Sequence, residues 1–166
     1  MSINLYIIRH AWAEARGPQW DADDSRRPLT EEGRRRWLQV ACQLTETGVR
    51  PSIVATSPYV RCRQTAEIFV KAVGHGCKLV DLEALEPGGR LDAAIEWTAT
   101  QARQGATEIA WVGHSPDVEF QLAALIGGDA ALRFAKGASA LVRFDFEIAR
   151  GLGELQWLVT AKILGF

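Results

Sequence analysis

The sequence predicts an α/β fold in which a mostly parallel sheet lies between two layers of helices and ends in a C-terminal antiparallel hairpin. Strand-like and helix-like segments alternate four times along the chain, and the last two apolar segments follow one another without a helix between them. The length of 166 residues is that of one ordinary domain, and there is no repeat, low-complexity tract or linker. We therefore expect residues 1–166 to form a single three-layer domain.

The N-terminal elements follow from residue type and spacing. Ile3–Ile8 consists of β-branched and large apolar residues, the pattern of a strand buried on both faces. The polar stretch Ala13–Pro28 has no periodicity and is predicted to be a long loop. Thr30 is a good helix N-cap followed by two acidic residues, and a helix is expected from there to Gly48. The apolar face of this helix has helical spacing and consists of Trp37, Val40, Ala41 and Leu44.

The rest of the chain continues the alternation. The further predicted strands are Ser52–Thr56, Lys78–Leu82 and Glu108–Val112, and the further predicted helices are Arg61–Val73, Leu91–Arg103 and Asp117–Ile126. Ala140–Phe146 and Glu154–Ile163 are predicted to be two strands, which the turn-like segment Arg150–Gly153 joins into the terminal hairpin.

Composition and charge exclude several classes of protein. Nineteen basic and twenty acidic residues give a formal charge of −1, so no net positive field attracts nucleic acid or a membrane surface. The N-terminal apolar run is too short for a signal peptide, and no segment approaches the roughly 18 apolar residues of a membrane span. Three cysteines without metal-type spacing indicate reduced thiols and no structural zinc. We therefore expect a cytoplasmic protein without nucleic-acid or membrane partners.

Polar clusters follow three of the predicted strands. They are Arg9-His10 after the first strand, Ser57 to Arg61 after the second, and Gly113-His114-Ser115 after the fourth. Because the ligand crevice of an open α/β sheet lies beyond the carboxyl ends of its strands, we expect the clusters to meet in one mouth. The P-loop, nucleophile-elbow, cysteine-phosphatase and His-Glu-x-x-His signatures are absent from the sequence.

Two arginines and two histidines in one crevice are suited to binding and transferring a phosphoryl group. Arginine forks hold the oxygens of a phosphate, and their charge disfavours imidazolium, so that a neighbouring histidine stays neutral and nucleophilic. Phosphoryl transfer requires mainly positioning and charge neutralisation, which these side chains supply without a metal or other cofactor. The pattern predicts a phosphate site with an imidazole nucleophile.

The chain also contains three longer motifs: Leu5-Tyr6-Ile7-Ile8-Arg9-His10-Ala11, Ser57-Pro58-x-x-Arg61-x-x-Gln64-Thr65-Ala66 and Val112-Gly113-His114. Together they resemble the signatures of the histidine phosphatase superfamily (phosphoglycerate mutase-like). The short chain and the motif Arg27-Pro28-Leu29-Thr30-x-x-Gly33 are similar to the SixA-type phosphohistidine phosphatases in particular.

The resemblance implies that His10 is the nucleophile that becomes phosphorylated. It also implies that Arg9, Arg61 and His114 bind the phosphoryl group. The usual family motif has glycine after the Arg-His pair, where this chain has Ala11, and we expect its methyl group to lie beside the phosphate.

The substrate class depends on whether the site contains an acid for the leaving group. An alkyl phosphomonoester requires a nearby carboxylic acid, whereas the imidazole of phosphohistidine leaves with little help. Glu83 and Glu86, in the loop before Gly88, are the candidate acids, and both could equally be solvated loop charges.

The leading hypothesis is a metal-independent phosphatase that hydrolyses phosphohistidine on a protein. The loops after the second, third and fourth strands are short, so that only Ala13–Pro28 remains to form a wall, and an open mouth favours a phosphorylated protein. The first alternative is a phosphatase for small phosphomonoesters with Glu86 or Glu83 as its acid. The second alternative is a non-catalytic adaptor that binds phosphate.

Overall fold

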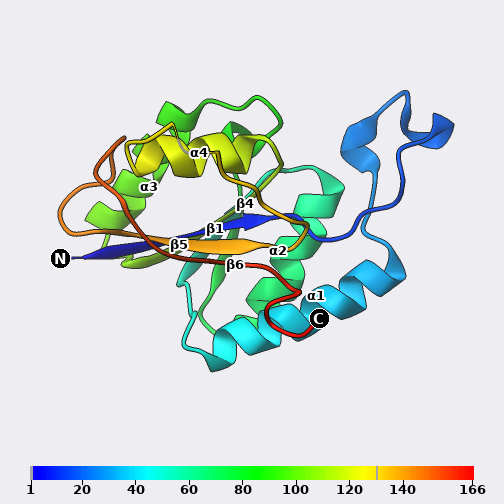
Figure 1. Ribbon diagram of the computed structural model, residues 1–166, viewed down its shortest axis with the longest axis horizontal. Helices are drawn as coiled ribbons and strands as arrows, with labels where there is room; N and C mark the ends of the chain where they lie inside the picture. The colour runs from blue at the N-terminus through cyan, green and yellow to red at the C-terminus, as the bar shows by residue number, and fades with distance from the viewer. Residues whose placement is uncertain (1, 130) are drawn as a thin grey trace.

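The computed structural model describes residues 2–129 and 131–166, and within these residues six strands form one mixed sheet (Figure 1). Their order across the sheet is β3-β2-β4-β1-β5-β6. Strands β1 to β4 run parallel, whereas β5 pairs antiparallel with β1 and β6 pairs antiparallel with β5. The predicted parallel sheet with a C-terminal hairpin is confirmed. The bounds are β1 (Ile3–Arg9), β2 (Ile53–Thr56), β3 (Lys78–Asp81), β4 (Glu108–Gly113), β5 (Ser139–Phe144) and β6 (Glu154–Val159).

Helices cover both faces of this sheet (Figure 1). One face carries α1 (Glu31–Glu46) and α2 (Val60–Val73), and the other carries α3 (Leu91–Arg103) and α4 (Asp117–Leu125). Successive residues of β1 pack into the two layers in turn, as the pleat of a doubly covered strand requires. Leu5 and Ile7 lie in the core under α3 and α4, and Tyr6 and Ile8 lie in the core over α1 and α2.

The first predicted helix forms as expected. The Thr30 hydroxyl accepts a hydrogen bond from the Gly33 N–H at 2.9 Å and so caps α1. The face that carries Trp37 is buried against the sheet. In the described residues, no helix combines the length and apolarity that a membrane crossing requires.

The sequence prediction made both strands of the hairpin too long at their C-terminal ends. β6 ends at Val159 instead of Ile163, because the chain turns after it and the Ile163 N–H donates to the Thr160 carbonyl at 3.1 Å. The C-terminus then lies on α1, where a guanidinium N–H of Arg36 donates to the Phe166 carbonyl at 2.8 Å. β5 also ends early, at Phe144.

The long loop between β1 and α1 protrudes beyond the sheet, at the right of Figure 1. Its base is closed by a bridge between Ala13 and Leu29 and by a 2.9 Å hydrogen bond from the Glu14 N–H to the Pro28 carbonyl. It contains two short 3-10 turns, η1 (Pro18–Trp20) and η2 (Asp24–Arg26). The predicted long loop is therefore closed at its base and contains two short helical turns.

The connections that follow the neighbouring strands β1 and β4 lead to opposite faces of the sheet. The chain leaves β1 toward α1 on one face and leaves β4 toward α4 on the other, which creates a crevice at their carboxyl ends. The pairing continues one residue past β1, since the His10 N–H donates to the Gly113 carbonyl at 3.0 Å. His10 and His114 therefore leave the sheet at nearly the same level.

Candidate active site

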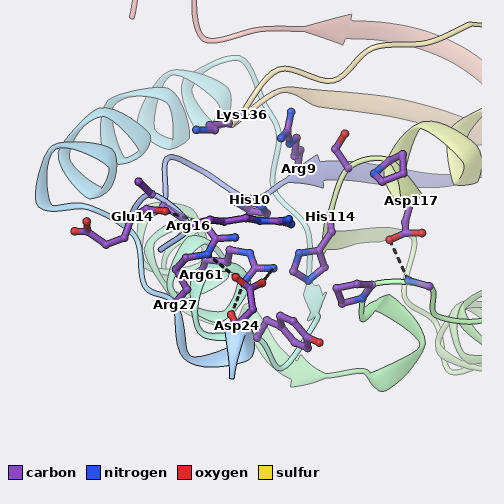
Figure 2. Close-up of a pocket in the computed structure, with 17 residues that line it drawn as sticks. Arg9, His10, Glu14, Arg16, Asp24, Arg27, Arg61, His114, Asp117 and Lys136 are labelled. Carbon is purple, nitrogen blue, oxygen red and sulfur yellow. Dashed lines mark hydrogen bonds and ion pairs between the residues drawn. The ribbon is translucent and has the colours of Figure 1, made fainter. Parts of the chain in front are cut away.

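A pocket of about 660 Å³ opens at the carboxyl ends of β1 and β4 (Figure 2). Its lining includes Arg9, His10, Arg61 and His114, so the expected convergence of the three clusters is observed. Five cationic and three acidic side chains line it, which gives the pocket a positive balance in a chain whose net charge is −1. The remaining charged residues of the lining are Glu14, Arg16, Asp24, Arg27, Asp117 and Lys136.

The His10 ring has one nitrogen free for chemistry. Its Nδ1 lies 2.8 Å from the Ala11 carbonyl oxygen, which can only accept, so Nδ1 carries the proton and the lone pair is on Nε2. Burial first, and then the nearby charges of Arg61 and Arg9, lower the pKa of His10 to about 3. His10 is therefore neutral at pH 7. The expected effect of the arginines is present, but burial is the larger cause.

His114 faces His10 across the crevice. The two ring centroids are 5.5 Å apart with the planes at 63°, and Figure 2 shows the rings edge to face. His114 Nε2 lies 2.9 Å from the Ser57 hydroxyl oxygen, which orients the ring. Burial and, next, the charge of Arg61 lower the pKa of His114 to about 3. Both imidazoles are therefore neutral at pH 7.

Cys62 lies beneath His114, and its Sγ is 3.4 Å from Nε2 of that ring. Complete burial raises the pKa of this thiol well above its usual range. The sulfur is thus a neutral packing atom under the site, because only a thiolate would be a nucleophile.

Arg61 is almost fully buried, and the loop residue Asp24 holds its guanidinium from two sides. Nη2 lies 3.0 Å from Asp24 Oδ2, and Nη1 donates to the Asp24 carbonyl at 2.8 Å. The other carboxylate oxygen accepts from Arg27 Nε at 2.7 Å. The hydrogen bond from Arg27, together with the charge of Arg61, lowers the pKa of the Asp24 carboxyl. Asp24 is therefore ionised at neutral pH and cannot supply a proton.

Arg9 is positioned by the segment that precedes β5. Its Nη1 donates to the Phe134 carbonyl at 2.7 Å. The N–H of Phe134 donates to Glu119 Oε1 at 3.1 Å, and the same oxygen accepts from the Ser115 hydroxyl at 2.8 Å. Glu119 thereby ties this segment to the first turn of α4. The second wall of the pocket, which the sequence did not predict, is this segment and its Lys136.

The candidate acids Glu83 and Glu86 do not belong to the pocket lining. The 3-10 turn η3 (Glu83–Leu85) buries the Leu85 side chain, and the chain then presents Pro87 and Gly88 to the pocket. The carboxyl at this position is Asp117, whose Oδ2 accepts from the Gly88 N–H at 3.2 Å. This loop therefore contributes Pro87 and Gly88 to the pocket lining, and neither of its two glutamates.

The methyl group of Ala11 packs in the core and does not line the pocket. Ala11 is fully buried, belongs to the core that contains Trp37 and is absent from the pocket lining. Its N–H donates to the Thr65 hydroxyl at 3.1 Å. Alanine in place of the usual glycine is therefore accommodated in the core behind His10.

Asp24 and Arg27 are, with Lys136 and Asp117, among the site residues that sequence reasoning missed. Asp24 and Arg27 lie in a segment without periodicity, so no pattern placed their side chains. The motif from Arg27 to Gly33 was the one available signal. In residues 2–129 and 131–166, no three His, Cys, Asp or Glu side chains are grouped to hold a metal ion.

The low pKa values predict an unusual acid titration. In the folded protein without phosphate, the ring NMR signals of His10 and His114 are expected to stay constant from pH 8 to pH 5. In the urea-unfolded chain they should titrate near pH 6.5. Since the unfolded state then binds more protons, the free energy of unfolding falls as the pH is lowered below 6.5. Each histidine contributes up to about 1.4 kcal/mol per pH unit to this loss. A midpoint between pH 6 and 7 in the folded protein contradicts this prediction.

Comparisons with known proteins agree with this geometry. The family model of the histidine phosphatase superfamily (branch 1) matches residues 5–87. The phosphohistidine phosphatase SixA of Escherichia coli K12 is 26% identical over 155 residues, which are 93% of this chain and 92% of that protein. An uncharacterized protein of Picosynechococcus is 35% identical over 116 residues, which are 70% of this chain and 68% of that protein.

The fold has a close counterpart among solved structures. The structure of the protein histidine phosphatase SixA complexed with tungstate matches with a TM-score of 0.86 at 26% identity. The match covers 98% of this chain and 99% of that one.

Proposed function

The chain belongs to the histidine phosphatase superfamily, and from this premise we propose that it hydrolyses phosphohistidine on a protein through a phospho-His10 intermediate. The similarity to SixA, whose name is that of a phosphohistidine phosphatase, supports the substrate class. The observation that carries the proposal is the geometry of the pocket, in which the His10 ring is bonded through Nδ1 to the Ala11 carbonyl and shares the lining with Arg9, Arg61 and His114. The protonation states that follow from this environment agree with it. His10 is a neutral nucleophile, and the carboxylate nearest to the arginines is ionised.

In the proposed first step, the Nε2 lone pair of His10 attacks phosphorus while the bond from phosphorus to the substrate imidazole breaks. Arg9, Arg61 and His114 bind the phosphoryl oxygens and neutralise their charge. When solvent has protonated the other nitrogen of the substrate ring, that ring leaves as neutral imidazole without a protein acid. A water molecule then attacks the phospho-His10 phosphorus, the bond to Nε2 breaks, and orthophosphate is released.

Metal independence is part of the same proposal. The charge that a divalent cation would supply in other phosphoryl-transfer sites comes from Arg9 and Arg61, which are permanently protonated. Turnover is therefore expected to survive treatment with a chelator.

Asp117 supports a second candidate function, a phosphatase for small phosphomonoesters. This carboxyl lines the pocket opposite the loop-borne arginines, as Figure 2 shows, and one of its oxygens is 3.2 Å from the Gly88 nitrogen. A protonated Asp117 would serve as the acid that an alkyl leaving group requires.

A substrate panel distinguishes these functions. A phosphohistidine peptide is expected to have a kcat/KM about 10³-fold above that of glycerol phosphate, because a missing general acid costs that much for an alkyl leaving group. Asp117→Asn and Glu86→Gln should retain phosphohistidine cleavage. Comparable turnover of glycerol phosphate that Asp117→Asn abolishes supports the phosphomonoesterase instead. Phosphate binding without turnover of any substrate supports the adaptor.

A further inference from the structure

Three exposed cationic side chains, Arg16, Arg133 and Lys136, flank the mouth of the pocket. Arg16 and Lys136 belong to the pocket lining and come from the two opposite walls (Figure 2). Arg133 immediately precedes Phe134, which binds Arg9, and lies near enough to Arg9 for its charge to lower the pKa of that guanidinium. We refer to these three residues as the cationic rim.

In the part of the chain that the structure describes, the cationic rim forms no direct ion pair. Within residues 2–129 and 131–166, none of its three side chains makes a hydrogen bond or an ion pair. The deeper cations differ, because Arg61 and Arg27 share the Asp24 carboxylate and Arg9 is bonded to a carbonyl. The rim charges are therefore available to a partner.

Three acidic side chains lie near the cationic rim without pairing with it. Asp24 is near enough to Arg16 for that charge to help lower the pKa of its carboxyl, but its two oxygens are already bound by the deeper arginines. Asp117 accepts from the Gly88 N–H on the far side of the pocket from Arg16. The Glu14 carboxylate points away from His10 in Figure 2, and its backbone carbonyl accepts from Arg27. The mouth keeps a positive balance even though the whole chain has a charge of −1.

Building on the proposed function, we propose that the cationic rim docks an acidic surface surrounding the phosphohistidine of the substrate protein. A phosphoryl group seated at His10 is held by the deeper arginines, so the rim faces the residues around the phosphorylated side chain. Exposed charges of this kind act through steering and selection of the partner more than through tight contact. Three cations are also too few for a nucleic-acid site, which commonly neutralises about six to ten phosphates.

Two phosphohistidine peptides of equal length test the proposal, one with Glu and the other with Lys on both sides of the phosphohistidine. At low ionic strength, kcat/KM is expected to be roughly tenfold higher for the Glu peptide, and salt should reduce the ratio toward one. Arg133→Glu combined with Lys136→Glu should invert the preference. The matched control is Arg50→Glu with Lys78→Glu, which reverses two exposed charges at the amino ends of β2 and β3, away from the mouth, and should keep the preference.

Fluorescence anisotropy with the His10→Ala variant gives a readout that does not depend on turnover. Tighter binding of the Glu peptide, lost in the rim double variant, supports docking even if the peptides are not hydrolysed, in which case only the proposed function fails. Equal binding and equal turnover of the two peptides overturn the docking proposal and leave the phosphohistidine activity intact.

Discussion

His10→Ala is expected to lose phosphatase turnover by a factor on the order of 10⁴ or more, because removing a covalent nucleophile removes the two-step route itself. The variant should still fold, since the neutral ring contributes one backbone hydrogen bond, at 2.8 Å from Ala11. The measurements are kcat/KM on a phosphohistidine peptide and the thermal midpoint.

The matched control for this variant is His75→Ala. His75 is exposed in the turn between two glycines and is not part of the pocket. Its replacement should leave turnover at the wild-type level. Full activity in His10→Ala, or an equal loss in both variants, contradicts the assignment of the nucleophile.

Arg61→Ala is expected to lower kcat/KM by about 10³-fold, because a buried guanidinium that neutralises a transferring phosphoryl group is worth that much. The substitution also leaves the Asp24 carboxylate facing the pocket without its 3.0 Å partner, which adds repulsion toward an anionic substrate. Arg61→Lys should recover part of the loss, since it restores the charge without the planar fork.

Arg63→Ala is the control on the same helix. Arg63 is partly exposed and forms surface ion pairs with Glu67 and Asp81, so its loss should change neither turnover nor stability greatly. The role of Arg61 is contradicted if both substitutions reduce kcat/KM equally.

The architecture could be predicted because its signals are local and repeated. The apolar run of β1 identifies a strand that is covered on both faces. Thr30 and the two acidic residues that follow it identify the start of α1. The strand order could not be predicted in this way, because alternation does not say that β4 inserts between β1 and β2. The prediction of where the hairpin strands end was wrong for a related reason. Apolar residues after Val159 pack over α1 and not in a strand.

The four central site residues could be predicted because each lies within a few positions of a strand end. The carboxyl ends of parallel strands share one edge of the sheet, so topology brings such residues together whatever the strand order. Asp24 and Arg27 depend on how one irregular loop folds back, and Lys136 depends on a segment without secondary structure. The tautomer of His10 depends on a single distance to a backbone carbonyl. Apart from the motif that begins at Arg27, none of these features has a sequence pattern.

The most direct test of the central claim is to trap the phosphorylated enzyme during turnover. Rapid quenching with a labelled phosphohistidine substrate, followed by peptide mapping, is expected to place the label on His10 as an acid-labile, base-stable phosphoramidate. Label on Ser57 or Cys62, or steady turnover with no phosphorylated protein at any quench time, contradicts a phospho-His10 intermediate.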